Sequence, residues 1–331
     1  MKKILFVSYG SITKKHIQNL KLIKKKFVIG ILRKKNKETE IGKYIVFNKI
    51  SDAISFNPDA VFICSPANQH IYYLKKFMGV CDNIFVEKPL FINTNQLRNI
   101  KFQKIKNFQL GYFLRYHPHL QKLKKIIKNN HYGKIKSVQI EVGQYLPDWR
   151  KEVPYNKTVS AQKKLGGGVM LELSHEIDYA VWLFGIPKFL FCQNKKLSNL
   201  KIDVEDYSTI YFDYPKEKKI VHINLNMLQK NMSRSCTIIF EKKTLKIDFI
   251  RGTFFELIGK NYKVIDFLGK NFLKQLLLVQ DSHFLSKLDI PVNLNKKNKI
   301  NDFANFKTGE ILSKIFAKLE LSNKKKKVVH Y

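Results

Sequence analysis

The first third of the chain alternates short apolar runs with stretches in which apolar residues recur at helical spacing. Short apolar runs bounded by turn residues are typical of buried strands, and a period near 3.6 is typical of helices. We therefore predict strands over residues 3–8, 27–32, 44–47, 59–65, 83–86 and 108–113, and helices over 13–23, 69–78 and 94–102. A strand followed repeatedly by a helix predicts a doubly wound parallel α/β sheet.

The pattern changes near residue 134, where longer runs of alternating apolar and polar residues begin. They predict strands over 135–142, 209–214, 220–227, 236–240 and 244–250, in an open and mostly antiparallel sheet. Helices are expected over 169–184 and 301–321, and the basic tail from residue 323 should fray. We expect two domains, over residues 1–115 and 116–331.

The charge and the cysteines limit the classes of function. The net charge is +35, but the 61 basic residues are 55 lysines and only 6 arginines, spread along the whole chain. Because base recognition favours arginine, we expect no specific nucleic-acid partner, although the positive field should attract anionic substrates. The four cysteines lack metal-ligand spacing, so free thiols in a reducing cytoplasm and no metal site are expected. No apolar run is long enough for a membrane span, and the short run 4–7 fits a buried strand better than a signal peptide.

Candidate chemistry stands where the predicted parallel strands end. The first strand leads into Ser8, Gly10, Ser11 and Ile12, where a dinucleotide-binding domain would hold a pyrophosphate at the helix N-terminus. Only the middle glycine of that fingerprint is present, so an ordinary turn is the alternative. Arg33 follows the second strand, where a basic residue favours a 2′-phosphate and hence NADP, or is simply solvated.

Two later strands also end in polar residues. One ends at Ser65-Pro66 with His70 in the first turn of the next helix, and another ends at Glu87-Lys88-Pro89. A lysine beside a buried strand end can have a lowered pKa and exchange protons at neutral pH; a surface salt bridge with Glu87 is the alternative.

A glycine triplet, Gly166 to Gly168, precedes the helix expected over 169–184. On a continuous helix Leu171, His175, Asp178 and Trp182 would share one face. A histidine with an aspartate three residues later, beside a glycine-rich entry, suggests a site, and a histidine satisfied within the core is the alternative.

Taken in order, these motifs resemble the glucose–fructose oxidoreductase / inositol dehydrogenase / MocA family, abbreviated Gfo/Idh/MocA. The motifs are Ser65-Pro66 with His70, Glu87-Lys88-Pro89, Gly111-Tyr112 with Arg115-Tyr116-His117-Pro118, and the glycine triplet with His175 and Asp178. The similarity also includes Arg234 and the segment 282–284. Residues 143–150, with Ser160-Ala161, resemble a branch common in surface-polysaccharide gene sets.

The resemblance implies a Rossmann domain, NAD or NADP as cofactor, a sugar or nucleotide-linked sugar as substrate, and a homodimer or homotetramer. Lys88 would be the principal proton donor or acceptor, and His175 would hydrogen-bond the same substrate hydroxyl. The cofactor would be lined by Ser8, Gly10, Ser11, Ile12, Arg33, Ser65, Pro66, Asn68, His70 and Glu87. The substrate would be lined by Arg115, Tyr145, Trp149, Glu172 and Asp178.

Three departures from the family pattern keep other functions open. Ser8 and Thr13 replace two fingerprint glycines, and Leu171 stands where many members have an aspartate, with Glu172 beside it. One alternative is transient oxidation leading to epimerisation or elimination without net redox change. The other is a regulatory protein that binds cofactor without turnover.

Overall fold

The chain forms two compact units, Met1–Tyr116 with Leu276–Ser313, and His117–Gln275 with Lys314–Tyr331. The structure, a computed structural model, describes residues 1–23, 26–33, 43–93, 95–96, 100, 105–150, 152–288, 290 and 302–331. The first unit therefore includes a late segment, 276–313, and in this respect it differs from the single boundary expected after residue 115. Because the association of residues 276–313 with the first 116 residues is non-local, the local sequence pattern could not indicate it.

The first unit is built on a six-stranded sheet with the order β3-β2-β1-β4-β5-β6. All its strand pairs are parallel, as predicted. The strands are β1 (Lys2–Val7), β2 (Phe27–Leu32), β3 (Ile45–Phe47), β4 (Ala60–Ile63), β5 (Asn83–Val86) and β6 (Asn107–Leu110). The helices are α1 (Ser11–Leu22), α2 (Ile50–Ser55) and α3 (His70–Phe77), with short 3₁₀ turns η1 (Ala67–Gln69) and η2 (Phe113–Tyr116). This is the doubly wound Rossmann arrangement.

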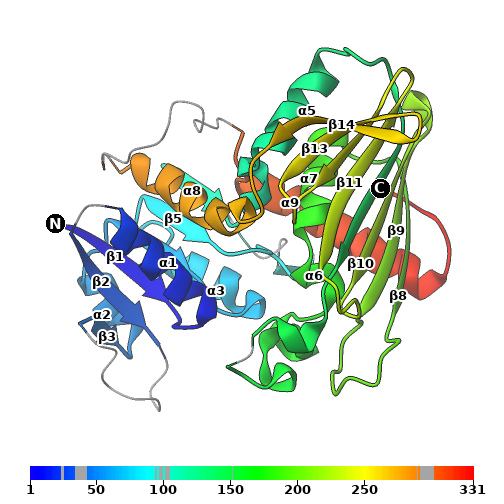
Figure 1. The fold of residues 1–331 in the computed structure, drawn as a ribbon. Coiled ribbons are helices and arrows are strands. Elements are labelled where there is room, and N and C mark those ends of the chain that lie inside the picture. The colour runs from blue at the N-terminus through cyan, green and yellow to red at the C-terminus, as the bar shows by residue number, and fades with distance from the viewer. Residues whose placement is uncertain are drawn as a thin grey trace. The chain divides into compact units, whose positions relative to one another are not determined.

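Both faces of this sheet are covered, which explains why its strands are uniformly apolar. Residues 4–7, 60–63 and 84–86 are almost completely buried. In Figure 1 helix α8 (Phe272–Ser286) lies along the sheet near β5. Its Phe284 contacts the rings of Phe62 and Phe85, with centroids 5.2 and 5.6 Å away. Residues of α8 thus complete the core of the first unit.

The second unit contains a nine-stranded sheet with the order β14-β13-β12-β11-β7-β10-β9-β8-β15. Only the β7–β10 pair is parallel among the pairs described, so the sheet is mostly antiparallel, as predicted. Its strands are β7 (Ile135–Gly143), β8 (Phe189–Lys195), β9 (Tyr207–Tyr214), β10 (Lys219–Asn226), β11 (Ser233–Phe240), β12 (Thr244–Asp248), β13 (Thr253–Ile258), β14 (Asn261–Phe267) and β15 (Val329–His330). The strands β8, β13, β14 and β15 were not predicted.

One face of this sheet is buried and the other is largely open. Along β10 and β9 alternate side chains are fully buried, and helix α7 (His175–Phe184) packs against β10. The open face carries Tyr211, Ile220 and Ile239, which are 41%, 50% and 40% exposed. The remaining helices of this unit are α5 (Pro118–Lys128), α6 (Val169–Glu172) and the later part of α9 (Phe306–Lys325).

Two helix predictions for the second half of the chain were wrong in detail. The helix expected over 169–184 is two helices, α6 and α7, because Leu173 (φ −97°, ψ 27°) leaves the helical conformation. The helix expected over 301–321 runs from Phe306 to Lys325. The tail does not fray as expected, since Val329 and His330 pair with β8.

The helix expected over 94–102 lies mostly outside the described residues. Within the part of the chain that is described, no helix is both long and apolar enough to cross a membrane. All four cysteines are buried free thiols, as expected.

Candidate functional site

The first turn, between β1 and α1, has Ser8 and Thr13 where the dinucleotide-binding fingerprint has glycines. Ser8 adopts φ +81°, a left-handed value that favours glycine. Its N–H donates to the carbonyl of Leu32 at 2.8 Å, and its own carbonyl accepts a 3.2 Å hydrogen bond from the Thr13 hydroxyl. Thr13 is fully buried. The backbone of Ser8 and the hydroxyl of Thr13 thus hold this turn through hydrogen bonds.

The space around Gly10 suits close approach of a ligand. A Cβ on Gly10 would meet no described atom within 4 Å. Gly10 is the N-cap of α1, whose first residues are Ser11 and Ile12, and as a glycine it has no side chain to cap the first-turn N–H groups. Helix N-termini attract phosphate groups, so this turn can hold a pyrophosphate. Arg33, half-buried at the end of β2, donates its backbone N–H to Phe47 O at 3.0 Å.

The segment after β4 offers a buried polar atom to a ligand. The Ser65 hydroxyl is buried and has no hydrogen-bond partner among the described residues. Pro66 precedes η1, Asn68 lies within it, and His70 is the first residue of α3. The two ring nitrogens of His70 lie 2.8 Å from the carbonyl oxygens of Ser65 and Pro89. Burial lowers the pKa of His70, opposed by these two carbonyls. His70 therefore ties the strand end at Ser65 to the one that carries Lys88.

The segment after β5 carries the half-buried Lys88. Its backbone N–H donates to Glu87 Oε2 at 3.2 Å, and the peptide bond to Pro89 is cis. Glu87 Oε1 lies 3.1 Å from Nε2 of the buried His16. The Glu87 carboxyl is therefore held inside the first unit.

Parallel strands place their carboxyl ends at the same edge of a sheet. The structure therefore brings together at one edge the predicted residues after β1, β2, β4 and β5. Arg115, in η2, belongs to the same unit and is 5% exposed, with Nη1 4.0 Å from Asp302 Oδ1.

The other predicted residues belong to the second unit. Tyr145 and Trp149 follow β7, and the Trp149 indole N–H donates to Gln144 O at 3.1 Å. The Lys230 ammonium lies 5.8 Å from the centroid of the Tyr145 ring. Both rings are half-buried, so part of each remains open to a ligand.

The glycine triplet is required by space and by backbone conformation. A Cβ on Gly167 would stand 2.3 Å from Val159 O, and Gly168 has φ +109°. The following helix α6 is fixed by two contacts: Ser160 Oγ donates to Glu172 Oε2 at 2.8 Å, and Met170 N–H donates to Glu205 Oε1 at 3.2 Å. These contacts accompany the break after Glu172, so Leu171 belongs to α6 and not to the helix of His175 and Asp178.

Helix α7 begins at His175, and both His175 and Asp178 are buried, one turn apart. Between them Glu176 is fully buried and accepts two hydrogen bonds from Arg234 of β11, from Nε at 2.7 Å and from Nη2 at 2.9 Å. Burial would lower the pKa of Arg234, but Glu176 raises it above the usual value. This ion pair anchors the helix that carries His175.

Sequence reasoning missed His16, which contacts Glu87, and Asp281, which contacts His16. His16 and Asp281 are fully buried, and Nδ1 of His16 lies 2.8 Å from Asp281 Oδ1. The only local signal was a histidine on the apolar side of α1, beside Thr13, Ile17 and Leu20. No pattern could pair it with an aspartate 265 residues later.

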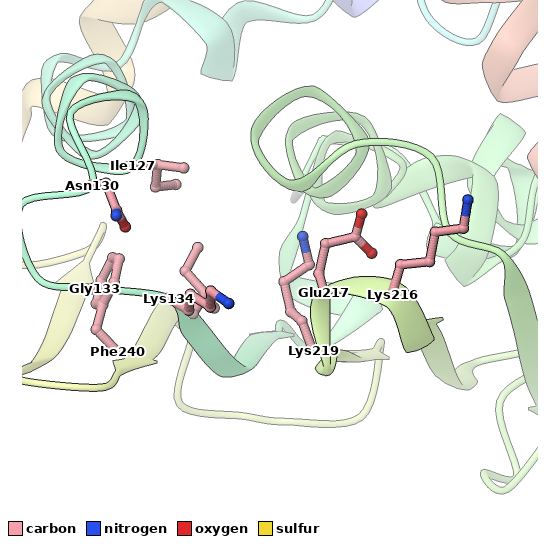
Figure 2. Close-up of a pocket in the computed structure, with 9 residues that line it drawn as sticks. Ile127, Asn130, Gly133, Lys134, Lys216, Glu217, Lys219 and Phe240 are labelled. Atoms are coloured by element: carbon pink, nitrogen blue, oxygen red, sulfur yellow. The ribbon is translucent and has the colours of Figure 1, made fainter.

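A pocket of about 350 Å³ in the second unit contains none of the predicted site residues. Figure 2 shows Lys134, Lys216, Glu217 and Lys219 around it. The buried Lys219 ammonium already donates to Phe184 O at 2.9 Å and lies over the Tyr214 ring. Among the described residues, no group of three or more His, Cys, Asp or Glu side chains is arranged to hold a metal.

Comparisons with known proteins bear on both units. Residues 2–106 match the oxidoreductase family with an NAD-binding Rossmann fold, and residues 120–246 match the GFO/IDH/MocA C-terminal domain. The uncharacterized oxidoreductase YrbE of Bacillus subtilis is 28% identical over 131 residues, covering 38% of this chain and 36% of that protein. Glucose-6-phosphate 3-dehydrogenase of B. subtilis is 23% identical, over 75% of this chain and 74% of that one.

Solved structures agree in fold. The WlbA dehydrogenase from Bordetella pertussis, in complex with NADH and UDP-GlcNAcA, has a TM-score of 0.78 and 16% identity, covering 100% of this chain and 97% of that chain. At this identity the similarity concerns the fold. With the two family matches, it shows that the chain belongs to the Gfo/Idh/MocA family of oxidoreductases, with an NAD-binding domain of the Rossmann type in residues 2–106.

Proposed function

We propose that the protein is a nicotinamide-dependent oxidoreductase acting on a hydroxyl or keto carbon of a sugar or nucleotide-linked sugar. The observation that carries this proposal is the position of Lys88, which follows β5 at the same sheet edge as the open turn at Gly10. The unpaired hydroxyl of Ser65 at that edge also fits a bound dinucleotide. Members of the same family and the WlbA complex with NADH support the same choice of cofactor.

Different residues of the first unit would bind different parts of the cofactor. Backbone N–H groups at Ser11 and Ile12 would hold the pyrophosphate, and Ser65, Pro66, Asn68 and His70 would line the rest of the cofactor. Arg33 would face the ribose and favour NADP. When bound, the nicotinamide supplies the donor or acceptor of a hydride.

Lys88 and His175 would act on the same substrate oxygen. Lys88 would give a proton to that oxygen during reduction or take it during oxidation, and His175 would hydrogen-bond the same group. Arg115, Tyr145, Trp149, Glu172 and Asp178 would surround the sugar. A nucleotide-linked sugar acid is our preferred substrate class, because its negative charge suits a chain of net charge +35 and WlbA was crystallised with UDP-GlcNAcA.

The Ser8–Thr13 turn supports the binding of a dinucleotide, which the oxidoreductase and the regulatory alternative both require, so turnover is what separates the two. Ser8 adopts the positive φ that the first fingerprint glycine would favour, and the Thr13 hydroxyl donates a hydrogen bond to the Ser8 carbonyl. We also propose a homodimer or homotetramer, supported by the apolar residues on the open face of the second sheet; light scattering after size exclusion would test it.

The first experiment is calorimetric titration with NAD(H) and NADP(H), where absence of binding at millimolar cofactor contradicts the proposal. Turnover is then sought by nicotinamide absorbance with UDP-linked sugar acids, sugar phosphates and inositols. Lys88→Met should lower kcat on the order of 10²–10⁴-fold while the cofactor Kd changes little. His175→Ala should lower kcat/KM, with part of the loss in KM.

Lys75→Met is the matched control, since Lys75 is exposed on α3 in the same unit. Near-normal turnover in Lys88→Met, with an active control, would remove the proposed mechanism and leave only the fold.

A further inference from the structure

The pocket of the second unit lies at one end of the nine-stranded sheet. It is formed where β7 and β10 begin and β11 ends, beside the last turn of α5. These three strands are neighbours in the order β11-β7-β10, so residues from distant parts of the sequence meet there. The volume of about 350 Å³ falls within the range of small-molecule sites, about 300–1,000 Å³. The pocket is therefore large enough for a small organic ligand.

The lining of this pocket combines apolar and cationic side chains. The apolar part comes from Ile127, Ile135 and Phe240. Figure 2 shows the end of the Lys134 side chain extending toward Lys219. Both ammonium groups therefore border the same cavity as the apolar side chains.

Lys219 occupies a core position of its strand. It shares the buried face of β10 with Val221 and Ile223, and it is only 9% exposed. Its ammonium donates a 2.9 Å hydrogen bond to the carbonyl of Phe184, the last residue of α7. An ammonium has three donors, and Lys219 makes no second hydrogen bond within the described part of the chain. Capping the helix thus uses one N–H of Lys219 and leaves two for a ligand.

The charge of these lysines is not balanced by the described carboxylates. Burial lowers the pKa of Lys219 below its usual value, and Glu217 opposes this shift without forming an ion pair. Glu241 accepts the backbone N–H of Lys134 at 3.0 Å, but its carboxylate is already paired with Lys136 Nζ at 2.8 Å. The pocket lining as a whole contains three lysines and one carboxylate. This excess of positive charge suits an anion.

We propose that the pocket is a second ligand site, which binds a small organic phosphate with its phosphate between Lys134 and Lys219 and its organic part against the apolar lining. A phosphate has enough oxygen atoms to accept hydrogen bonds from both ammonium groups, and lysine is a common phosphate ligand. The apolar lining favours an ester over inorganic phosphate, because the organic group removes that lining from water. None of the residues proposed for the cofactor or the substrate lines this pocket, so the inference does not depend on the proposed function.

The test measures how far a ligand protects Lys134 from acetylation, which reports on this pocket whether or not phosphate also binds elsewhere. Acetylation of the full-length protein is quantified by mass spectrometry at increasing concentrations of phenyl phosphate, inorganic phosphate or benzoate. Phenyl phosphate at millimolar concentration should slow the acetylation of Lys134. Its apparent Kd should be lower than that of inorganic phosphate, which lacks the apolar part, and that of benzoate, which carries one negative charge. Lys260, exposed in the same unit and outside the pocket, should react at an unchanged rate.

Two variants should change the affinity in opposite directions. Lys219→Met should raise the apparent Kd of phenyl phosphate by about tenfold or more, because it removes a charged hydrogen-bond donor. Glu217→Gln should lower the Kd several-fold, because it removes the opposing carboxylate at an exposed position. Lys260→Met is the matched control variant and should leave the Kd unchanged.

Absence of Lys134 protection by phenyl phosphate in the wild-type protein would overturn the inference, and so would an unchanged Kd in Glu217→Gln. Equal protection by benzoate would overturn the assignment of a phosphate ligand. These outcomes do not use Lys219→Met, so they stand if loss of the α7 cap unfolds that variant. Because no readout needs turnover, absence of dehydrogenase activity would refute the proposed function alone.

Discussion

The buried ion pair between Arg234 and Glu176 should be a major support of the second unit. Arg234→Met would leave the Glu176 carboxylate fully buried without its two hydrogen bonds, which measure 2.7 and 2.9 Å. Removing one partner of a buried pair costs about 3–5 kcal/mol, because the remaining charge stays desolvated. In a unit of this size each kcal/mol lowers Tm by roughly 2–4 °C, so a decrease of about 6–20 °C is expected.

The two tryptophans make this measurement specific. Trp149 and Trp182 both belong to the second unit, so urea unfolding followed by tryptophan fluorescence reports on that unit. Arg251→Met is the matched control, because the Arg251 side chain is 74% exposed and its contact with Asp248 is 3.8 Å long. An exposed pair of this kind contributes at most about 1 kcal/mol.

A double variant separates the lost charge from lost packing. Arg234→Met with Glu176→Leu removes both charges and should recover most of the stability that Arg234→Met alone loses. The reasoning would be refuted if Arg234→Met cost less than about 1 kcal/mol, or if the double variant were no more stable than the single one.

Three further outcomes are expected. Ser8→Gly should stabilise the first unit by about 0.5–1 kcal/mol in thermal unfolding followed by circular dichroism, because Ser8 has φ +81°; a loss of stability would contradict the role given to this turn. His119 is buried, and burial lowers its pKa to about 4, so the unfolded chain, with a histidine pKa near 6.5, binds more protons in between. Stability of the second unit should therefore fall as pH decreases from about 6.5 towards 4. Urea melts of His119→Leu should show a smaller fall, and an equal one would exclude His119 as its cause. Arg33→Ala should reduce any preference for NADP over NAD in calorimetric Kd values, and an unchanged ratio would mean that Arg33 does not contact the ribose phosphate.

The accuracy of the sequence predictions followed how locally each feature is determined. Strands β1, β4 and β5 were found because a parallel strand covered on both faces must be apolar along its length. The position of Lys88 after such a strand followed from the same pattern. By contrast, β14 was missed although it contains Val264, Ile265 and Phe267. It is mostly exposed, and its pairing with β13 is what makes it a strand.

The break between α6 and α7 shows where local patterns fail. Residues 169–184 have the apolar spacing of one helix, yet Glu172 and Met170 are fastened to Ser160 and Glu205, which lie elsewhere in the chain. Helix propensity is a weak preference that such contacts override. Consequently His175 and Asp178 lie on one helix, α7, as predicted, whereas Leu171 belongs to α6.

The sequence by itself determined the two sheets, the strand ends that carry Ser65 and Lys88, and membership of an oxidoreductase family. These depend on periodicity and on short motifs, which are properties of neighbouring residues. Only the tertiary structure decided that α8 returns to the first sheet and places Asp281 against His16. That contact joins residues 265 positions apart, and it forms because two buried carboxyls and one imidazole are far more stable together than any of them is alone inside an apolar core.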